Sequence, residues 1–378
     1  MSAEEIGRLR AALLGWYDGA KRDLPWRERA GDPYAVWVSE VMLQQTRVDT
    51  VLPYYARFLE RFPTLRALAE AREDEVMGAW SGLGYYRRAR LLHSGVREVV
   101  ARYGGEVPVD PEARRSLPGV GRYTAGALGS VCFGLEEPIV DGNVARILTR
   151  IFGIASPLPE RETQKRLWAL AEALVVGERP GDFNQAMMEL GALVCTVKRP
   201  KCDACPARDA CVARAEGTSE QLPLIPRKTP PQRAELVAVV ATRGERVVMV
   251  RGDDALFGGL YGLPMTAVDA PGTGPAPSSG ADTPDAVRHN AARLALASAG
   301  VSGRLGREPV APPVSHVLSH RRLTVHVYGA THARLAEAGS GRLLEVDAHG
   351  VVRTPDVGIA RLTHKVLEAA RSAPRSAR

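Results

Sequence analysis

Residues 117–131, LPGVGRYTAGALGSV, place a Gly-x-Gly turn directly before a run of residues that can form a helix. Gly119 and Gly121 let the backbone turn tightly, so the first amides of the next helix can face a phosphate, and the positive end of a helix favours an anion. The nearby Arg114 and Arg122 add positive charge that reads no base sequence. Because a Gly-x-Gly turn alone more often only connects two helices, the stretch by itself predicts a helix–turn–helix segment that could bind a nucleic-acid backbone.

The sequence on both sides of this turn, up to about residue 212, has the apolar spacing of helices. Leu9, Leu13 and Trp16 recur at helical intervals near the start, and the same spacing continues through VWVSEVMLQQTRVDT. We therefore expect residues 1–212 to form an all-helical domain.

The pattern changes after residue 212. The segment SEQLPLIPRKTPPQR contains four prolines and has no periodicity, which predicts an interdomain linker over residues 213–233. Beyond it, ELVAVVATRGERVVMVRG resembles two strands around a short turn, RRLTVHVYGATH alternates like a further strand, and DAVRHNAARLALASAG is an amphipathic helix candidate. These patterns predict an α+β domain over residues 234–370 and a disordered tail over residues 371–378.

Four cysteines lie within seventeen residues and form the array C-x6-C-x2-C-x5-C: Cys195, Cys202, Cys205 and Cys211. Four thiolates can hold a tetrahedral zinc ion or an iron-sulfur cube. The spacing leaves both open, but three uneven gaps in succession differ from the paired hooks of zinc ribbons and favour a cluster. A disulfide framework is disfavoured because no stretch resembles a secretory signal.

Composition sets outer bounds on function. The chain has 378 residues, 45% of them hydrophobic, and a net charge of +7. This length suits about two domains, and no apolar run approaches the ~18 residues of a membrane span. The positive charge is compatible with a polyanionic partner. We expect a monomer in the cytoplasm, associated with the nucleoid if the source is bacterial.

Four strings together carry a family resemblance: VSEVMLQQT, GLGYYRRAR, LPGVGRYTAGA and DGNVARIL. They resemble MutY-type adenine DNA glycosylases of the endonuclease III superfamily. The resemblance implies a helix-hairpin-helix at about residues 114–131 and a [4Fe-4S] loop at residues 195–211, held by the four cysteines. It is looser beyond the linker, where the family has a Nudix-like domain, similar to MutT, that helps to recognise 8-oxoguanine.

Two carboxylates match the chemistry that such an enzyme needs. Release of adenine requires an acid for the base and an anion near the cationic sugar. Glu40 lies in an apolar helical stretch that would raise the pKa of its carboxyl, which suits a general acid at adenine N7. Asp141 opens DGNV, where the local sequence favours a helix N-cap. The resemblance instead implies that Asp141 is the catalytic carboxylate and that Asn143 orients it.

Tyr123 separates two reaction types. In the bifunctional relatives of the endonuclease III superfamily, the corresponding position holds a lysine that forms an imine with the sugar and leads to strand cleavage. Tyrosine cannot form that imine. The resemblance therefore implies a monofunctional hydrolase whose product is an abasic site.

Extrusion of a base from the duplex needs residues that fill the gap and a pocket for the base. The resemblance assigns Gln44 and Gln45 to the base-stack probe and Tyr85 to the aromatic beside the lesion, and it places Arg27 and Gln185 in the adenine pocket. Without the resemblance, the glutamines would be an exposed helix end and Tyr85 a core residue.

The C-terminal half departs from a Nudix hydrolase. In RLALASAGV, Leu294, Ala297 and Ser298 stand where the Nudix box has glutamates, so magnesium has no carboxylate ligands there. We expect this domain to bind nucleotides without hydrolysing them.

The stretch SHVLSHRRL resembles the family loop that recognises 8-oxoguanine through Phe-Ser-His. Here the three residues are Leu318, Ser319 and His320. The missing aromatic predicts a weaker intercalating contact, whereas Ser319 and His320 retain hydrogen-bonding groups.

Together, the motifs and the family resemblance predict a monofunctional adenine DNA glycosylase of base excision repair. Its expected partner is double-stranded DNA containing A:8-oxoG or A:G. Two alternatives remain: a glycosylase/lyase for damaged pyrimidines like endonuclease III, which Tyr123 disfavours, and a non-enzymatic iron-sulfur DNA-binding protein, in which Glu40 and Asp141 would be dispensable.

Overall fold

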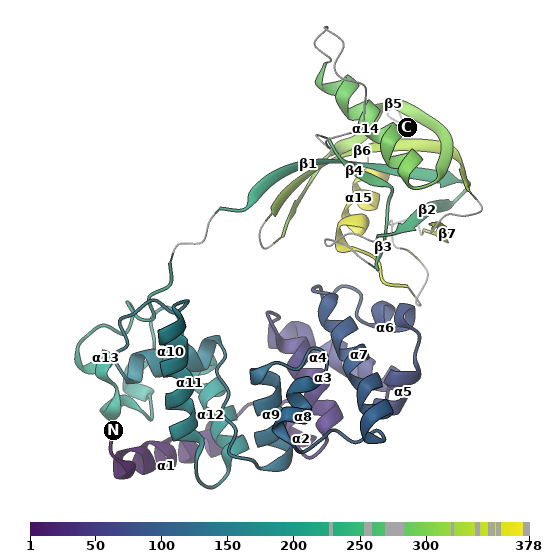
Figure 1. The fold of residues 1–378 in the computed structure, drawn as a ribbon. Helices are drawn as coiled ribbons and strands as arrows, with labels where there is room; N and C mark the ends of the chain where they lie inside the picture. The colour runs from purple at the N-terminus through teal and green to yellow at the C-terminus, as the bar shows by residue number, and fades with distance from the viewer. Residues whose placement is uncertain are drawn as a thin grey trace. The chain divides into compact units, whose positions relative to one another are not determined.

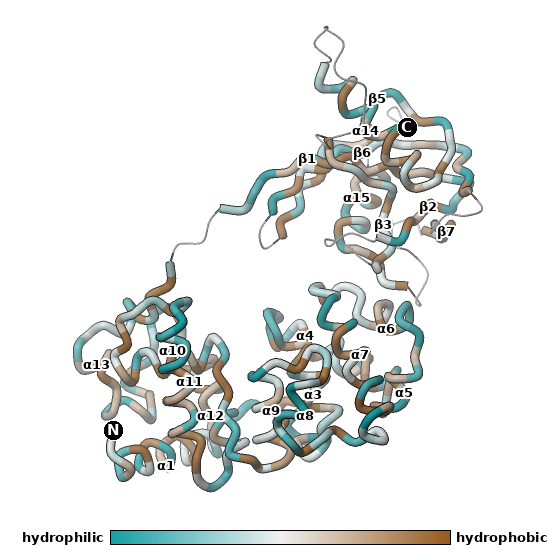
Figure 2. Tube along the Cα trace, in the orientation of Figure 1, coloured by the Kyte–Doolittle hydropathy of each residue, from teal (hydrophilic) through white to brown (hydrophobic). Residues whose placement is uncertain are grey.

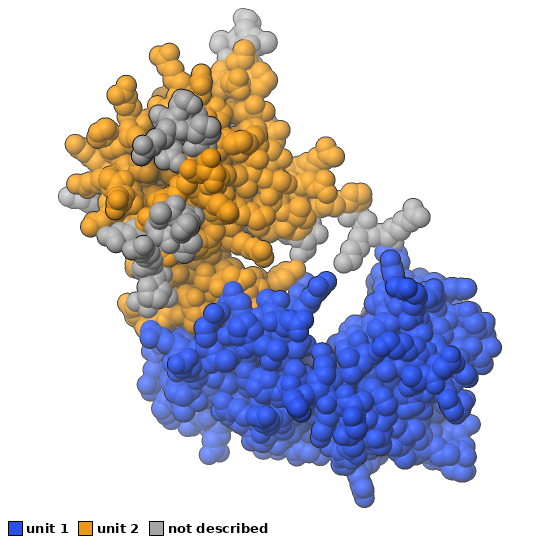
Figure 3. Space-filling view, turned by 180° about the vertical axis from the view of Figure 1, so that it is seen from behind, with its two compact units in different colours: residues 1–71, 87–228 blue, residues 72–86, 229–378 orange. Residues whose placement is uncertain are grey.

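The computed structural model divides into two compact units. One comprises residues 1–71 and 87–228, and the other comprises residues 72–86 and 229–378 (Figure 3). The structure describes residues 1–226, 230–252, 259–268, 283–318, 321–336, 341–346, 352 and 357–372. Among these residues, no helix is both long and apolar enough to cross a bilayer.

The first unit is helical, as the sequence predicts (Figure 1). Its helices are α1 (Ala3–Ala20), α2 (Pro25–Glu28), α3 (Pro33–Leu43), α4 (Val48–Arg61), α5 (Leu65–Glu70), α7 (Arg87–Tyr103), α8 (Pro111–Ser116), α9 (Arg122–Phe133), α10 (Gly142–Ile151), α11 (Arg161–Val175), α12 (Pro180–Leu193) and α13 (Val212–Ala215), with 3-10 turns η1 (Cys202–Ala204) and η2 (Arg208–Ala210) in the cysteine loop.

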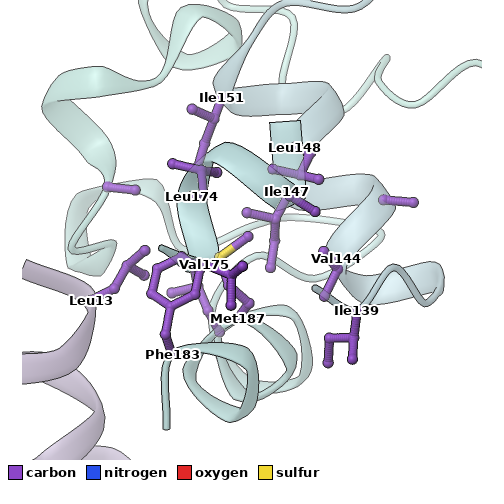
Figure 4. Close-up of a cluster of buried hydrophobic side chains, with 14 of the residues drawn as sticks. Leu13, Ile139, Val144, Ile147, Leu148, Ile151, Leu174, Val175, Phe183 and Met187 are labelled. Carbon is purple, nitrogen blue, oxygen red and sulfur yellow. The ribbon is translucent and has the colours of Figure 1, made fainter. Parts of the chain in front are cut away.

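A buried apolar cluster joins five of these helices (Figure 4). It contains side chains from α1, α9, α10, α11 and α12, including Leu13, Ile147, Leu174, Phe183 and Met187. Along most of these helices, apolar and polar stretches alternate (Figure 2), so that one face can be buried while the other stays in water, whereas α3 is buried continuously from Tyr34 to Met42. This packing fixes α10 and α12 against each other, and both helices carry candidate site residues.

The Gly-x-Gly turn lies between α8 and α9, where the sequence predicts it. Gly119 has φ +78°, and a Cβ there would lie 2.7 Å from the Cβ of Leu91, so both its conformation and its surroundings require glycine. Gly121 is different, because its φ of −83° suits any residue and a Cβ would meet only open space. As the N-cap of α9, Gly121 therefore leaves the start of that helix accessible.

The second unit contains a mixed sheet in the order β3-β2-β1-β6-β5, with β4 paired to β1 and β7 paired to β2. The strands are β1 (Gln232–Arg243), β2 (Arg246–Arg251), β3 (Tyr261–Gly262), β4 (Met265–Ala267), β5 (Val301–Val317), β6 (Arg321–Leu335) and β7 (Gly341–Glu345). Strands β1 and β6 run parallel, whereas β5 and β6 are antiparallel with irregular register.

Two helices lie against this sheet, α14 (Pro284–Ser298) and α15 (Arg361–Ser372). Residues of β1 alternate between two cores: Val237 and Val239 belong to the cluster with α14, and Ala238 belongs to the cluster with α15. This period of two is what a strand buried on both faces requires. The predicted hairpin and the predicted helix of this half are both present. Helix α15 extends to Ser372, two residues into the predicted tail, and the rest of that tail lies outside the described residues.

The segment Arg72–Tyr86, which contains α6 (Glu73–Ala79), is grouped with the second unit. Within that unit Arg251 forms ion pairs of 3.4 Å with Glu73 and with Asp74. The hydroxyl of Tyr86 donates a 3.2 Å hydrogen bond to the carbonyl of Ile359. The division into compact units therefore does not coincide with the linker, because residues 72–86 belong to the same unit as residues 229–378.

Candidate active site

Glu40 lies on α3 with only 7% of its surface exposed. Asp32 begins this helix by accepting hydrogen bonds from the amides of Tyr34 and Ala35, and Pro33 occupies the first helical position. Burial raises the pKa of the Glu40 carboxyl to about 7. A hydrogen bond with Tyr123 acts in the opposite direction, and the charge of Asp141 raises the pKa further. The expectation of a carboxyl that keeps its proton near neutral pH therefore agrees with its surroundings.

Tyr123 lies in the first turn of α9, directly after the Gly-x-Gly turn. Burial, together with the nearby Glu40 and Asp141 charges, raises the pKa of its phenol well above the usual value. The phenol is therefore neutral and can donate, and its hydroxyl donates to Sδ of Met188 at 3.2 Å. Tyr123 thus belongs to the same electrostatic group as the two carboxylates.

Asp141 is the N-cap of α10. Its carboxylate accepts a hydrogen bond of 2.7 Å from the amide of Val144 and one of 3.0 Å from Nδ2 of Asn143. Burial raises the pKa of Asp141, and these hydrogen bonds, with the charge of Arg146, act against that rise. Asp141 can therefore be both the N-cap of α10 and a catalytic carboxylate. The cap fixes the carboxylate beside Glu40, and the start of the helix favours its charged form.

Hydrogen bonds of Arg146 link Asn143 to the cysteine loop. Nη2 of Arg146 donates to Oδ1 of Asn143 at 2.9 Å and to the carbonyl of Gly191 at 2.8 Å, and Nε donates to the carbonyl of Cys195 at 2.8 Å. Helix α12 packs closely against Asn143, because a Cβ added at Gly191 would lie 2.5 Å from the Cβ of Asn143. Sequence reasoning missed Arg146, although a charged residue inside the apolar run NVARIL was a usable signal.

The four cysteines line one small cavity together with Arg150 and Ser219. Among the described residues, no three His, Cys, Asp or Glu side chains converge closely enough to hold a single metal ion. Four cysteines around one space are the kind of ligands that a metal ion or an iron-sulfur cluster uses. Nη1 of Arg150 donates to Sγ of Cys195 at 3.2 Å.

The predicted base-stack residues are not core residues. Gln44 is the C-cap of α3, and Gln45 follows it, exposed and with φ +57°. In the second unit, Tyr85 is 47% exposed and has φ +49°. Non-glycine residues seldom adopt this backbone region, and such strain is concentrated at functional sites. The core interpretation of Tyr85 is therefore excluded.

Arg27 and Gln185 line a shared cavity of about 230 Å³ between α1, α2 and α12. Neither Glu40, Tyr123 nor Asp141 lines it. Arg27 is engaged by Glu189 at 2.9 Å and by the carbonyl of Arg22 at 2.6 Å. The structure thus brings these two predicted pocket residues together but does not place them in contact with the carboxylates.

Ser319 and His320 lie outside the described residues. Leu318, which precedes them, packs against the cluster shared by the sheet and α15. On α14, Leu294, Ala297 and Ser298 supply no carboxylate.

A helical unit in which a glycine turn leads into a helix bearing Tyr123, beside the buried carboxyl of Glu40 and the half-buried carboxyl of Asp141, defines a helix-hairpin-helix protein equipped for acid–base chemistry. Residues 38–173 match the model of the HhH-GPD superfamily of base excision DNA repair proteins. The chain is also similar to the solved structure of a thermostable thymine-DNA glycosylase, with 30% identity and a TM-score of 0.51, covering 56% of this chain and 98% of the other. The chain belongs to the HhH-GPD superfamily.

Curated relatives narrow the similarity further. The chain is 52% identical over 226 residues to an adenine DNA glycosylase of Homo sapiens. This match covers 58% of this chain and 41% of the human protein. It is 39% identical over 230 residues to an adenine DNA glycosylase of Buchnera aphidicola. This match covers 60% of this chain and 65% of the Buchnera protein. The match thus spans less than half of the human protein.

Proposed function

We propose that this chain is a monofunctional adenine DNA glycosylase that acts in base excision repair on adenine opposite 8-oxoguanine or guanine. The observation that carries the proposal is the pairing of Glu40, whose pKa is raised to about 7, with Asp141, which is fixed as the N-cap of α10. Similarity to adenine DNA glycosylases of two distant organisms supports the choice of base.

The two carboxyls divide the work of breaking the N-glycosidic bond. Protonated Glu40 delivers its proton to N7 of adenine, so the departing base leaves neutral. The Asp141 carboxylate stabilises the positive charge that develops on the sugar, and Asn143 holds that carboxylate in place. Water then adds to the sugar and loses a proton, which leaves an abasic site. Tyr123 supplies no amine, so strand cleavage through an imine does not follow.

The cysteine loop fits an iron-sulfur cluster better than zinc. In this proposal Cys195, Cys202, Cys205 and Cys211 hold a [4Fe-4S] cluster that staples the loop. Burial raises the pKa of the Cys205 thiol to about 11, so ligation would have to draw off its proton. Purified protein should therefore show broad visible absorbance and contain iron; stoichiometric zinc without iron would contradict the cluster.

The second unit is proposed as a Nudix-like, non-hydrolytic domain for lesion recognition. The absence of carboxylates at Leu294, Ala297 and Ser298 supports binding without hydrolysis. The packing of Leu318 against the core supports the expectation that it does not replace an intercalating aromatic. Ser319 and His320 remain candidate donors to the lesion. The full chain is proposed to bind duplex DNA as a monomer in the cytoplasm.

A single-turnover experiment tests the activity. Labelled duplexes containing A:8-oxoG, A:G, A:T, T:G or thymine glycol are incubated with the protein and analysed with and without alkali. Breaks at A:8-oxoG only after alkali are expected. Breaks at thymine glycol without alkali would move the chain to the lyase branch, and release of thymine from T:G would favour the activity named for the solved relative. Retained release by the Glu40→Gln variant would remove Glu40 as the acid, and DNA binding with no release from any duplex would favour the non-enzymatic alternative.

A further inference from the structure

Arg88, near the start of α7, reaches the C-terminal end of α3. Its Nη1 donates to the carbonyls of Val41 and Met42, each at 2.9 Å, and also to the carbonyl of Gln44. Its Nη2 donates to Oγ1 of Thr46 at 3.2 Å. The residue is only 9% exposed. One buried guanidinium therefore contacts both the last turn of the helix and the turn that follows it.

These contacts replace the usual C-terminal cap of a helix. The last four carbonyls of an α-helix lack partners within the helix, and a glycine cap often satisfies them. Helix α3 ends without glycine, at Leu43, whose carbonyl accepts from the amide of Thr46 at 3.2 Å. Arg88 satisfies the carbonyls of Val41 and Met42. Its positive charge also complements the negative end of the helix.

The turn held in this way contains the strained residue Gln45. A left-handed backbone is unfavourable for a residue with a Cβ, so the shape of the turn does not follow from Gln45 itself. It is imposed by contacts on either side, to Gln44 and Thr46, and Arg88 makes both. Glu40 lies one residue before Val41, so the proposed acid and the proposed base-stack probe are attached to the same anchored helix end.

We propose that Arg88 is a positioning residue that holds the Gln44–Thr46 turn in the shape needed to displace adenine from the duplex. The proposal rests on the proposed function, and it assigns Arg88 a role in base extrusion and none in bond cleavage. Lysine cannot replace it, because the planar guanidinium directs several donors at once toward fixed acceptors, whereas an ammonium is a compact point charge.

The test compares Arg88→Lys with a matched control, Arg10→Lys. Arg10 is also buried and donates to two backbone carbonyls, those of Leu174 and Glu178, but it lies on α1, away from α3. Each protein is given two duplexes, one with adenine paired to 8-oxoguanine and one with adenine in a bulge, where no pairing must be broken. A third duplex carries 2-aminopurine at the adenine position, so that extrusion appears as fluorescence without bond cleavage.

Arg88→Lys should slow release of paired adenine by about tenfold or more, the scale of one lost hydrogen bond to a charged group. Release of bulged adenine should fall less than about threefold, and the fluorescence increase should shrink. Arg10→Lys should leave the ratio of the two rates unchanged. Thr46→Val, which removes one acceptor of Arg88, should shift the ratio in the same direction by a smaller factor.

Equal slowing on paired and bulged adenine, or an unchanged fluorescence increase, would overturn the positioning role, because a merely structural role would not separate the two substrates. Failure of the proposed function would look different: wild-type protein would release no adenine from either duplex. The fluorescence arm would then still report whether Arg88 supports extrusion. Thermal melting of each variant, together with visible absorbance, checks that the fold is retained.

Discussion

Two buried glutamates of the helical unit, Glu40 on α3 and Glu189 on α12, have side-chain pKa values shifted in opposite directions. Both are at most 7% exposed, and burial alone raises the pKa of each. Glu189, however, accepts hydrogen bonds from Arg22 at 2.7 and 2.9 Å and from Arg27 at 2.9 Å, and these outweigh burial and lower its pKa to about 2. Glu40 instead has a phenol and a second carboxylate beside it, and its pKa rises to about 7. Burial therefore does not decide the role of a carboxylate; its neighbours do.

Removal of the acid should produce the largest effect. Glu40→Gln is expected to lower the single-turnover rate of adenine release by up to about 10⁴-fold, the upper range for general acid catalysis. Affinity for the duplex should stay within a factor of about three, because the amide has nearly the same shape as the protonated carboxyl. Gel-shift titration beside the kinetic assay measures both. If affinity and rate fell together, the residue would be structural and the contrast with Glu189 would fail.

Removal of the other carboxylate should affect stability. Glu189→Gln leaves Arg27 partly buried without its charge partner, and breaking a buried ion pair in this way costs about 3–5 kcal/mol. Urea unfolding at pH 7 measures the change. Arg22→Gln serves as the comparison and should cost less, because the side chain of Arg22 is 38% exposed. An equal or smaller loss for Glu189→Gln would show that the arginines do not depend on it.

The pH dependence of stability should separate the two glutamates by sign. The pKa of Glu40 lies near 7 in the folded protein against 4.5 as its ordinary value, so the folded state keeps a proton that the unfolded state releases. The free energy of unfolding should therefore fall by roughly 3 kcal/mol between pH 4.5 and 7 on account of Glu40. Glu189, with its lowered pKa, adds stability above pH 4.5 that is lost as the pH falls towards 2.

Urea unfolding of wild type and Glu40→Gln across pH 4.5 to 8 gives the Glu40 contribution as a difference curve. The variant should lack the decline. Parallel curves would show that Glu40 is not protonated in the folded protein. The same titration predicts that the rate of adenine release falls as the pH rises through about 7, because Glu40 must carry its proton to act as the acid.

A smaller effect is expected at Asn143. Asn143→Ala removes the amide that donates to Asp141, so burial would raise the pKa of Asp141 further. The acidic limb of the pH–rate profile, where Asp141 loses its charge, should move to higher pH, and the rate at neutral pH should fall by about tenfold. Profiles recorded from pH 4 to 9 measure the shift. A uniform fall without movement of the acidic limb would point to Asp141 being displaced rather than protonated.

Whereas the catalytic roles of Glu40 and Asp141 stay predictions that rest on the family resemblance, sequence alone predicted the helical unit and the sheet unit, because these depend on local patterns. The turn at Gly119 is an example, since its positive φ could be anticipated from glycine itself. The contacts of Arg88 with α3, and that of Arg146 with Cys195, could not, because these partners lie more than forty residues away along the chain. The positive φ of Gln45 could not be anticipated either, because residues with a Cβ seldom adopt that conformation. Sequence also treated Gly119 and Gly121 alike, although only Gly119 is sterically required.

The close packing of α12 against Asn143 makes position 191 sensitive to substitution. From sequence alone, alanine at this position would be judged a mild change inside a helix, because alanine favours helices. Its methyl group would nevertheless meet Cβ of Asn143 at 2.5 Å, and that atom belongs to the side chain that orients Asp141. We therefore expect Gly191→Ala to displace Asn143 from Asp141, a loss that inspection of the sequence around residue 191 would not reveal.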